Sequence, residues 1–440
     1  MSARLAITLL CLSAAVCGGV AARPGPASLY VTLPNGDLAG MPPVIDHANI
    51  YSETRSNNLS DAVAGALPRV YVPEHGGDSV SVIDTVTMKV IDHYPVGRNP
   101  QHSVPSWDLK TIWITNNSDD NTRNGSMTPI DPLTGKAGKN IAVEDPYNLY
   151  FTPDGKSAIV VNEAARRLDF RDPHTFEFQY SIVARDCQGI NHADFAANGT
   201  YAIFSCEFGG LIVKIDLVNR KVVGTLKLRT PPPRIRPEEI DFTPSEDNIC
   251  RGDGPGIVPA KALGKRKSSR RAMAVERSNM PQDIRVSPDG KTFYVADMMA
   301  DGVFTVDGDR FEQTGFIPTG IGAHGFCVSR DATKLYVANR GSHEMPAGTP
   351  GRPGSVSVID FATNKVVATW PILGGGSPDM GNVTADGKQV WFSGRFDNVV
   401  YAFDTTTGSV TKIPVGKEPH GLTVWPQPGR YSLGHTGNLR

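Results

Sequence analysis

The chain has 440 residues, with 44 Lys and Arg, 45 Asp and Glu and a formal net charge of −1. This balance argues against a protein that binds nucleic acids or other polyanions through its overall charge. Hydrophobic residues make up 40% of the chain, which excludes global disorder. The length suggests two or three domains unless the chain forms one large β domain.

The N-terminus has the three parts of a secretory signal peptide, predicted over residues 1–22. Arg4 provides the positive charge, Leu5 to Val16 form a short apolar run, and Val20-Ala21-Ala22 fits the small residues before a cleavage site. The run is too short to span a bilayer, and no later segment is apolar enough to do so. The sequence therefore predicts an exported protein without a membrane span, periplasmic or extracellular, with an extended leader over residues 23–68.

A strand motif begins at residue 69 and recurs along the chain. In its first copy, Arg69-Val-Tyr-Val72 and Ser79-Val-Ser-Val-Ile-Asp84 have the alternation of half-buried strands. Its last aspartate recurs every 41 to 53 residues, with one interval of 91, at Asp84, Asp131, Asp172, Asp216, Asp307, Asp360 and Asp404. Seven copies of a four-stranded unit predict an all-β fold, a seven-bladed β-propeller over residues 69–440.

Four cysteines remain once the signal peptide is removed, and two pairs can form among them in three ways. Cys187 and Cys206 flank two predicted antiparallel strands joined near Asn198-Gly199, so we predict a disulfide between them. Nothing in the sequence favours a pair between Cys250 and Cys327. Cys327 lies in an apolar stretch, which is typical of a buried free thiol.

The long interval indicates an insertion between blades over residues of about 228–278. It opens with Pro231-Pro-Pro233 and ends in a basic run, and it is expected to act as a lid, a loop that binds a partner, or a mobile excursion. The basic run lacks the aromatic residues that stack on bases, which favours a solvated loop over nucleic-acid binding.

The two ends of the repeat region complement each other. The N-terminal copy begins at its second strand, and Gly421 to Trp425 supplies a first strand near the other end. One blade combining both would close the ring and pair the open edges. Residues 431–440 have no place in this scheme. They could pair with the open edge of the first copy in place of Gly421 to Trp425.

Several copies resemble the YVTN-type, or 40-residue repeat, β-propeller family. The resemblance rests on Lys334-Leu-Tyr-Val-Ala-Asn339, followed by Ser355–Asp360 and Lys365-Val-Val-Ala-Thr369, and it covers roughly residues 69–430. It implies the propeller fold. Such propellers include surface-layer and periplasmic binding proteins, and the wider superfamily includes quinoprotein-like and haem- or copper-bearing propellers.

Polar residues recur where each innermost strand begins, beside the axis of the predicted ring. We expect Gln101, Asn148, Asp283 and Asp379 to bind a ligand in the axial funnel. Four histidines occupy nearly the same place and form a candidate site for copper or another transition metal, which neutral imidazole binds well: His102, His192, His324 and His420.

The register of these histidines argues against a shared metal ion. Aligned on the turns, His324 and His420 stand one residue earlier than His102 and His192. Adjacent residues of a strand point to opposite faces, so a bulge or a loop would be needed to bring all four together. The alignment therefore favours structural or solvated histidines.

No nucleotide-binding loop or nucleophile motif is present, so the catalytic residues, if any, are unknown. We expect an exported propeller that binds a small molecule or a protein segment in its axial funnel. The alternative is a metal oxidoreductase of the copper type with axial histidine ligands, and a less favoured one is a metal-dependent hydrolase or lyase. The sequence gives no indication of the oligomeric state.

Overall fold

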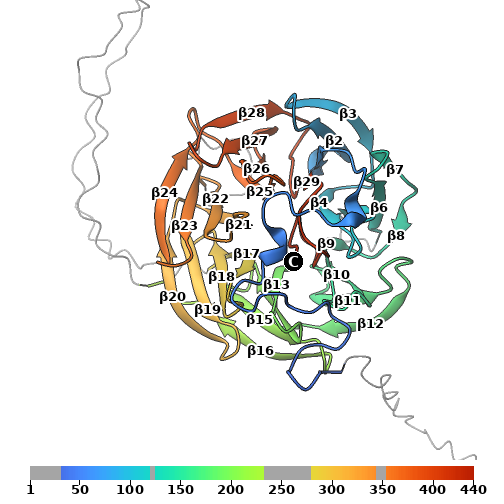
Figure 1. Ribbon diagram of the computed structural model, residues 1–440, viewed down its shortest axis with the longest axis vertical. Coiled ribbons are helices and arrows are strands. Elements are labelled where there is room, and N and C mark those ends of the chain that lie inside the picture. The colour runs from blue at the N-terminus through green and yellow to red at the C-terminus, as the bar shows by residue number, and fades with distance from the viewer. Residues whose placement is uncertain (1–30, 119–123, 232–278, 343–352) are drawn as a thin grey trace, which may run out of the picture.

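Seven antiparallel sheets surround a central axis in the computed structural model (Figure 1). The structure describes residues 31–118, 124–231, 279–342 and 353–440. The predicted signal peptide and residues 232–278 of the predicted insertion lie outside these ranges, as does Cys250.

In each blade the first strand named lies nearest the axis. Blade 1 contains β29 (Thr423–Trp425), β1 (Arg69–Glu74), β2 (Ser79–Asp84) and β3 (Lys89–Pro95). Blade 2 contains β4 (Pro100–Pro105), β5 (Ile112–Asn116), β6 (Ser126–Asp131), β7 (Lys136–Ala137) and β8 (Ile141–Ala142). Blade 3 contains β9 (Pro146–Phe151), β10 (Ala158–Asn162), β11 (Arg167–Arg171) and β12 (Phe178–Val183). Blade 4 contains β13 (Ile190–Phe195), β14 (Tyr201–Cys206), β15 (Leu211–Asp216) and β16 (Lys221–Lys227).

The other three blades have the same order. Blade 5 contains β17 (Pro281–Val286), β18 (Thr292–Asp297), β19 (Gly302–Asp307) and β20 (Glu312–Pro318). Blade 6 contains β21 (Ala323–Val328), β22 (Lys334–Asn339), β23 (Ser355–Asp360) and β24 (Lys365–Pro371). Blade 7 contains β25 (Pro378–Val383), β26 (Gln389–Gly394), β27 (Val399–Asp404) and β28 (Val410–Pro414).

The recurring aspartates mark the ends of the third strands. Six of the seven end their strand, and Asp172 follows β11 directly. Each of these carboxylates accepts backbone N–H groups of the turn that follows, as in Asp84 with Thr87 N at 2.6 Å, so the residue that ends the strand also fixes the turn. The prediction of seven blades is confirmed.

Pairing of distant parts of the chain closes the ring. Strand β29 pairs antiparallel with β1, with Arg69 opposite Trp425 and Tyr71 opposite Thr423. This confirms the predicted closure, and residues 431–440 do not take that edge. Because β29 covers the inner edge of β1, blade 1 needs no further strand on its axial side.

Buried apolar side chains lie between neighbouring blades. One cluster joins blades 1 and 2 and includes Tyr71, Ile114 and Trp425. Another joins blades 7 and 1 through residues such as Trp391 and Val424. Similar clusters fill the other five junctions. This packing of blade against blade holds the innermost strands at fixed positions around the axis.

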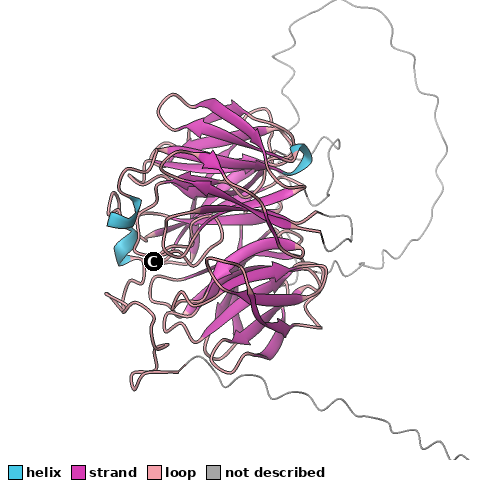
Figure 2. Cartoon of the chain, turned by 90° about the vertical axis from the view of Figure 1, so that its right-hand side faces the viewer, coloured by secondary structure: helices cyan, strands magenta, loops and turns pink. Residues whose placement is uncertain are grey.

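Residues 31–68 cross one face of the ring (Figure 1). They contain the 3-10 turns η1 (Ser52–Thr54) and η2 (Asp61–Val63). Leu38 N donates to Asn198 O at 2.8 Å, and Asn57 N donates to Ala385 O at 2.8 Å. Both acceptors belong to turns between the first and second strands of blades, so we call this side the turn face. Figure 2 shows η1, η2 and the last residues together on it.

The described ranges contain only one further 3-10 turn, η3 (His75–Gly77), besides these two. Figure 2 shows it on the opposite side, which we call the loop face because the loops that join successive blades lie there. None of the described helices is of a length and hydropathy that could cross a bilayer.

The predicted disulfide between Cys187 and Cys206 is present, with a Cα–Cα distance of 4.9 Å. It ties the loop before β13 to the end of β14, because Cys206 pairs with Ile190 across these strands. Cys327 is buried and unpaired, in agreement with the sequence analysis.

Replacing both Cys187 and Cys206 by serine is expected to lower the free energy of unfolding by about 3 kcal/mol, because the bond closes a chain segment of intermediate length. Chemical denaturation of oxidised wild type and double variant measures this difference. Reduction of the wild type should reproduce the change and should leave the double variant unaffected. Equal stability of all samples would contradict the prediction.

Candidate functional site

The innermost strands share an irregularity near their start. In blade 2, the pairing of β4 with β5 shifts between Pro100 and Ser103, and corresponding shifts occur in blades 4 to 7. A bulge lets two successive residues escape the strict alternation of a strand. In blades 2, 4 and 6 both residues can therefore turn toward the axis, so the register does not separate His102, His192 and His324.

The predicted histidines lie together at the axis, where their side chains are buried. The ring centroids of His102 and His192 are 5.4 Å apart. His420 lies 4.7 Å from His102 on one side, and His324 lies 6.3 Å from His192 on the other. The one-residue offset thus displaces two rings without removing them from the cluster.

A fifth histidine comes from the C-terminal segment. Residues 431–440, here called the axial hairpin, enter the ring from the turn face and fold back on themselves, with Ser432 opposite Leu439. Its tip reaches strand β9, where His435 N donates to Leu149 O at 3.1 Å. The ring of His435 lies 4.5 Å from His192 and 5.1 Å from His102, measured between centroids.

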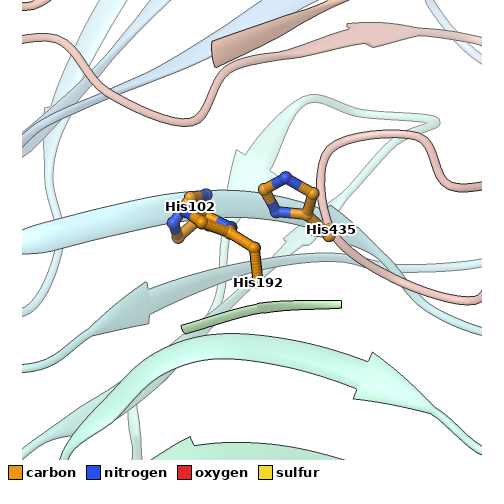
Figure 3. A group of neighbouring side chains, drawn as sticks. All are labelled: His102, His192 and His435. Carbon is orange, nitrogen blue, oxygen red and sulfur yellow. The ribbon is translucent and has the colours of Figure 1, made fainter. Parts of the chain in front are cut away.

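His102, His192 and His435 form a group that could hold a metal ion (Figure 3). One ring nitrogen from each lies within 4.8 Å of the others, and all three residues are buried. Among the described residues, both nitrogens of His102 and Nε2 of His192 have no hydrogen-bond partner. Buried polar atoms normally have partners, so these nitrogens are available to bind a ligand.

The three rings are held in the neutral form that binds metals. Burial lowers the pKa of His102 well below its ordinary value, and neighbouring His435 lowers it further. Burial also lowers the pKa of His192 and of His435. At neutral pH each imidazole therefore offers a lone pair.

The four residues predicted to bind a ligand contact the histidines. Gln101 Oε1 lies 2.9 Å from His420 Nδ1. Asn148 Nδ2 lies 3.2 Å from Nδ1 of His192 and 2.9 Å from Nδ1 of His435. Asp283 Oδ1 lies 3.3 Å from His435 Nε2. These side chains therefore orient the rings.

The carboxylate of Asp379 contacts the other two histidines, His324 and His420. Its Oδ1 lies 2.7 Å from His324 Nδ1 and accepts a 2.7 Å hydrogen bond from Arg340 Nη2, and its Oδ2 lies 3.4 Å from His420 Nε2. Burial alone would raise the pKa of Asp379, but Arg340 and the two rings outweigh it and hold the pKa well below its ordinary value. His324 and His420 are thus paired with a carboxylate, and the metal-competent group consists of the other three rings.

His435 is the functional candidate that the repeat analysis missed. It lies outside the repeat, so no alignment of blades includes it. Its place near the axis could have been inferred from the topology. Strand β29 is an innermost strand, so the chain that follows it starts beside the axis. Gly434 and Gly437 near the tip of the hairpin were a second signal, since both have positive φ.

Comparisons with known proteins agree on the fold. Residues 267–428 match the family model described as YNCE-like beta-propeller. A comparison with curated protein sequences gives no match.

Three solved structures are similar to this chain. A Kuenenia stuttgartiensis hydrazine synthase chain has 17% identity and a TM-score of 0.55, over 79% of this chain and 97% of its own. The dihydro-heme d1 dehydrogenase NirN in complex with DHE has 13% identity and a TM-score of 0.50, over 84% and 77%. A functionally unknown protein from Desulfotomaculum acetoxidans DSM 771 has 13% identity and a TM-score of 0.54, over 80% and 97%.

At these identities the likeness concerns the fold alone. The family match covers the later blades, and the ring of seven sheets extends the same architecture through the rest of the described chain. The chain is a seven-bladed β-propeller, and its residues 267–428 match the model of the YNCE-like beta-propeller family.

Proposed function

We propose that this protein is an exported binding protein that holds a transition-metal ion at the axis of its ring. The axial region enclosed by the innermost strands is here called the central channel. The observation that carries the proposal is the group of three buried imidazoles, His102, His192 and His435, with ring nitrogens that have no hydrogen-bond partner among the described residues. Export is supported by the disulfide, because such bonds persist in oxidising compartments.

The donor set selects the class of metal. Neutral imidazoles suit copper, zinc, iron and nickel, whereas Mg²⁺ and Ca²⁺ prefer oxygen ligands. A tetrahedral Zn²⁺ ion binds nitrogens at about 2.0–2.1 Å, which places them about 3.4 Å apart. The present separations of up to 4.8 Å therefore require only a modest closure of the rings. The carboxylate of Asp283 adds negative charge beside His435.

Asn148 can serve the site with and without metal. In the structure its NH₂ group faces Nδ1 of both His192 and His435. When Nε2 binds a metal, Nδ1 carries the ring proton and needs an acceptor. A half-turn of the carboxamide supplies its oxygen, at the cost of the hydrogen bond that Oδ1 accepts from Leu149 N at 2.8 Å.

The burial of the three rings favours a binding protein over an enzyme. His102, His192 and His435 have no exposed surface, so the ion would be shielded from large substrates. The axial hairpin of the chain itself lies beside these rings, where Gly434 pairs with Tyr150 of β9.

Titration of purified, metal-free protein with metal salts tests the proposal. We expect one Cu²⁺ or Zn²⁺ ion to bind per chain, Cu²⁺ more tightly because it stands higher in the order of divalent affinities. Mg²⁺ at the same concentration is the control and should give no heat. Absence of Cu²⁺ and Zn²⁺ binding after careful removal and return of metal would reject the function proposed here.

A further inference from the structure

The axial hairpin is anchored at the turn face by its last residues. Arg440 Nη2 donates to Phe195 O at 2.7 Å and to Asp194 Oδ1 at 3.2 Å. Asn438 Nδ2 donates to the same Asp194 oxygen at 3.0 Å. Because Asp194 is fully buried, these contacts fix the base of the hairpin to blade 4.

The tip of the hairpin has an unusual backbone conformation. His435 and Thr436 have φ of 42° and 45°, in the left-handed region that such residues rarely adopt. Gly434 has φ of 98°, and a Cβ atom there would lie 2.4 Å from Leu149 O, so the tip packs directly on the backbone of β9. A tip with this backbone needs strong contacts to stay in place.

We propose that the axial hairpin is a closure of the channel that the bound metal ion locks. This proposal rests on the function proposed above. His102 and His192 belong to the rigid ring, whereas His435 belongs to the hairpin, so an ion bound to all three ties the hairpin to the ring. Metal binding and docking of the hairpin then stabilise each other.

Thermodynamic linkage makes this coupling reciprocal. If the ion favours the docked hairpin by some factor, weakening the dock at a remote contact lowers the affinity for the ion through the same equilibrium. Arg440 provides such a contact, because it anchors the base of the hairpin at Asp194 and is not part of the three-histidine group.

Hydrogen exchange of the full chain with and without Zn²⁺ tests the closure. In the wild type, peptides covering residues 431–440 should exchange at least about 10-fold more slowly with Zn²⁺, because the tip is then tied down. Peptides from outer strand β24 serve as an internal control and should not change. In His435→Gln, Zn²⁺ should give no slowing in the hairpin and should bind more weakly.

The remote variant Arg440→Gln tests the linkage. Its hairpin should exchange faster without Zn²⁺, and its Zn²⁺ affinity should fall at least about 5-fold although no ligand is changed. Arg166→Gln is the matched control, since Arg166 Nη1 donates to Arg185 O on the exposed surface of blade 3, and its affinity should equal that of the wild type.

The outcomes separate the two proposals. Zn²⁺ binding to the wild type without slower exchange in residues 431–440 would overturn the closure and leave the metal site standing. Wild-type affinity in His435→Gln would overturn it as well. Failure of Zn²⁺ to bind the wild type at all would overturn both.

Discussion

Replacing His102 by alanine is expected to lower the affinity for Zn²⁺ and Cu²⁺ by about 100-fold or more, as loss of an outer-shell contact alone costs 10- to 100-fold. Both nitrogens of this ring lack a hydrogen-bond partner among the described residues, and the ring lies next to His192 and His435. Its removal therefore takes away a ligand without breaking a hydrogen bond of the ring. Calorimetric titration of wild type and variant measures the change.

A histidine far from the axis provides the control. His174 is exposed in a turn of blade 3, and His174→Ala should bind both ions as the wild type does. Thermal unfolding of the metal-free proteins shows whether His102→Ala remains folded. If the folded variant binds both ions with wild-type affinity, the three-histidine site is wrong.

Much of the fold could be predicted because the chain repeats its local chemistry. The aspartate at the end of Ser79–Asp84 serves both as the last residue of a strand and as the acceptor of the following turn, so one residue type marks every blade. The missing first strand before Arg69 indicated the closure at β29, since an unpaired edge must find a partner.

The candidate site was less predictable because it depends on departures from the repeat. Strict alternation separates His324 and His420 from His102 and His192, but a bulge in β21 and the segment before β29 bring both rings to the axis. Bulges arise from pairing between strands and leave no clear mark in a single sequence. His435 lies in a segment without a repeat, and only packing in the finished ring places it beside His192.

Substitution of Asp379 by asparagine is expected to lower the free energy of unfolding by about 3–5 kcal/mol, the range for breaking a buried ion pair. The carboxylate is fully buried and accepts hydrogen bonds from Nε and Nη2 of Arg340, at 3.1 and 2.7 Å. Asparagine keeps the shape of the side chain but removes its charge, which leaves a buried guanidinium without this carboxylate. Denaturation of metal-free wild type and variant measures the difference.

The stability difference between wild type and Asp379→Asn should depend on pH, in a direction that follows from the pKa of Asp379. Arg340, His324 and His420 hold the pKa of Asp379 well below its ordinary value despite the opposing effect of burial. A depressed pKa stabilises the folded protein above the unfolded pKa of about 3.9, and this stabilisation is lost as the pH falls through the folded pKa. The difference in free energy of unfolding between wild type and Asp379→Asn should therefore be largest at pH 7 and should shrink below about pH 4.

A double-variant cycle assigns the loss to the ion pair. If Arg340→Met is combined with Asp379→Asn, the cost of the second substitution should be smaller than its cost alone, with a coupling of about 1–3 kcal/mol. The control is the exposed pair of Lys388 and Asp386, whose atoms lie 3.8 Å apart, where Lys388→Gln should cost less than about 1 kcal/mol. Additive costs in the cycle would mean that Asp379 stabilises the ring through contacts other than Arg340, with the buried rings of His324 and His420 as the remaining partners.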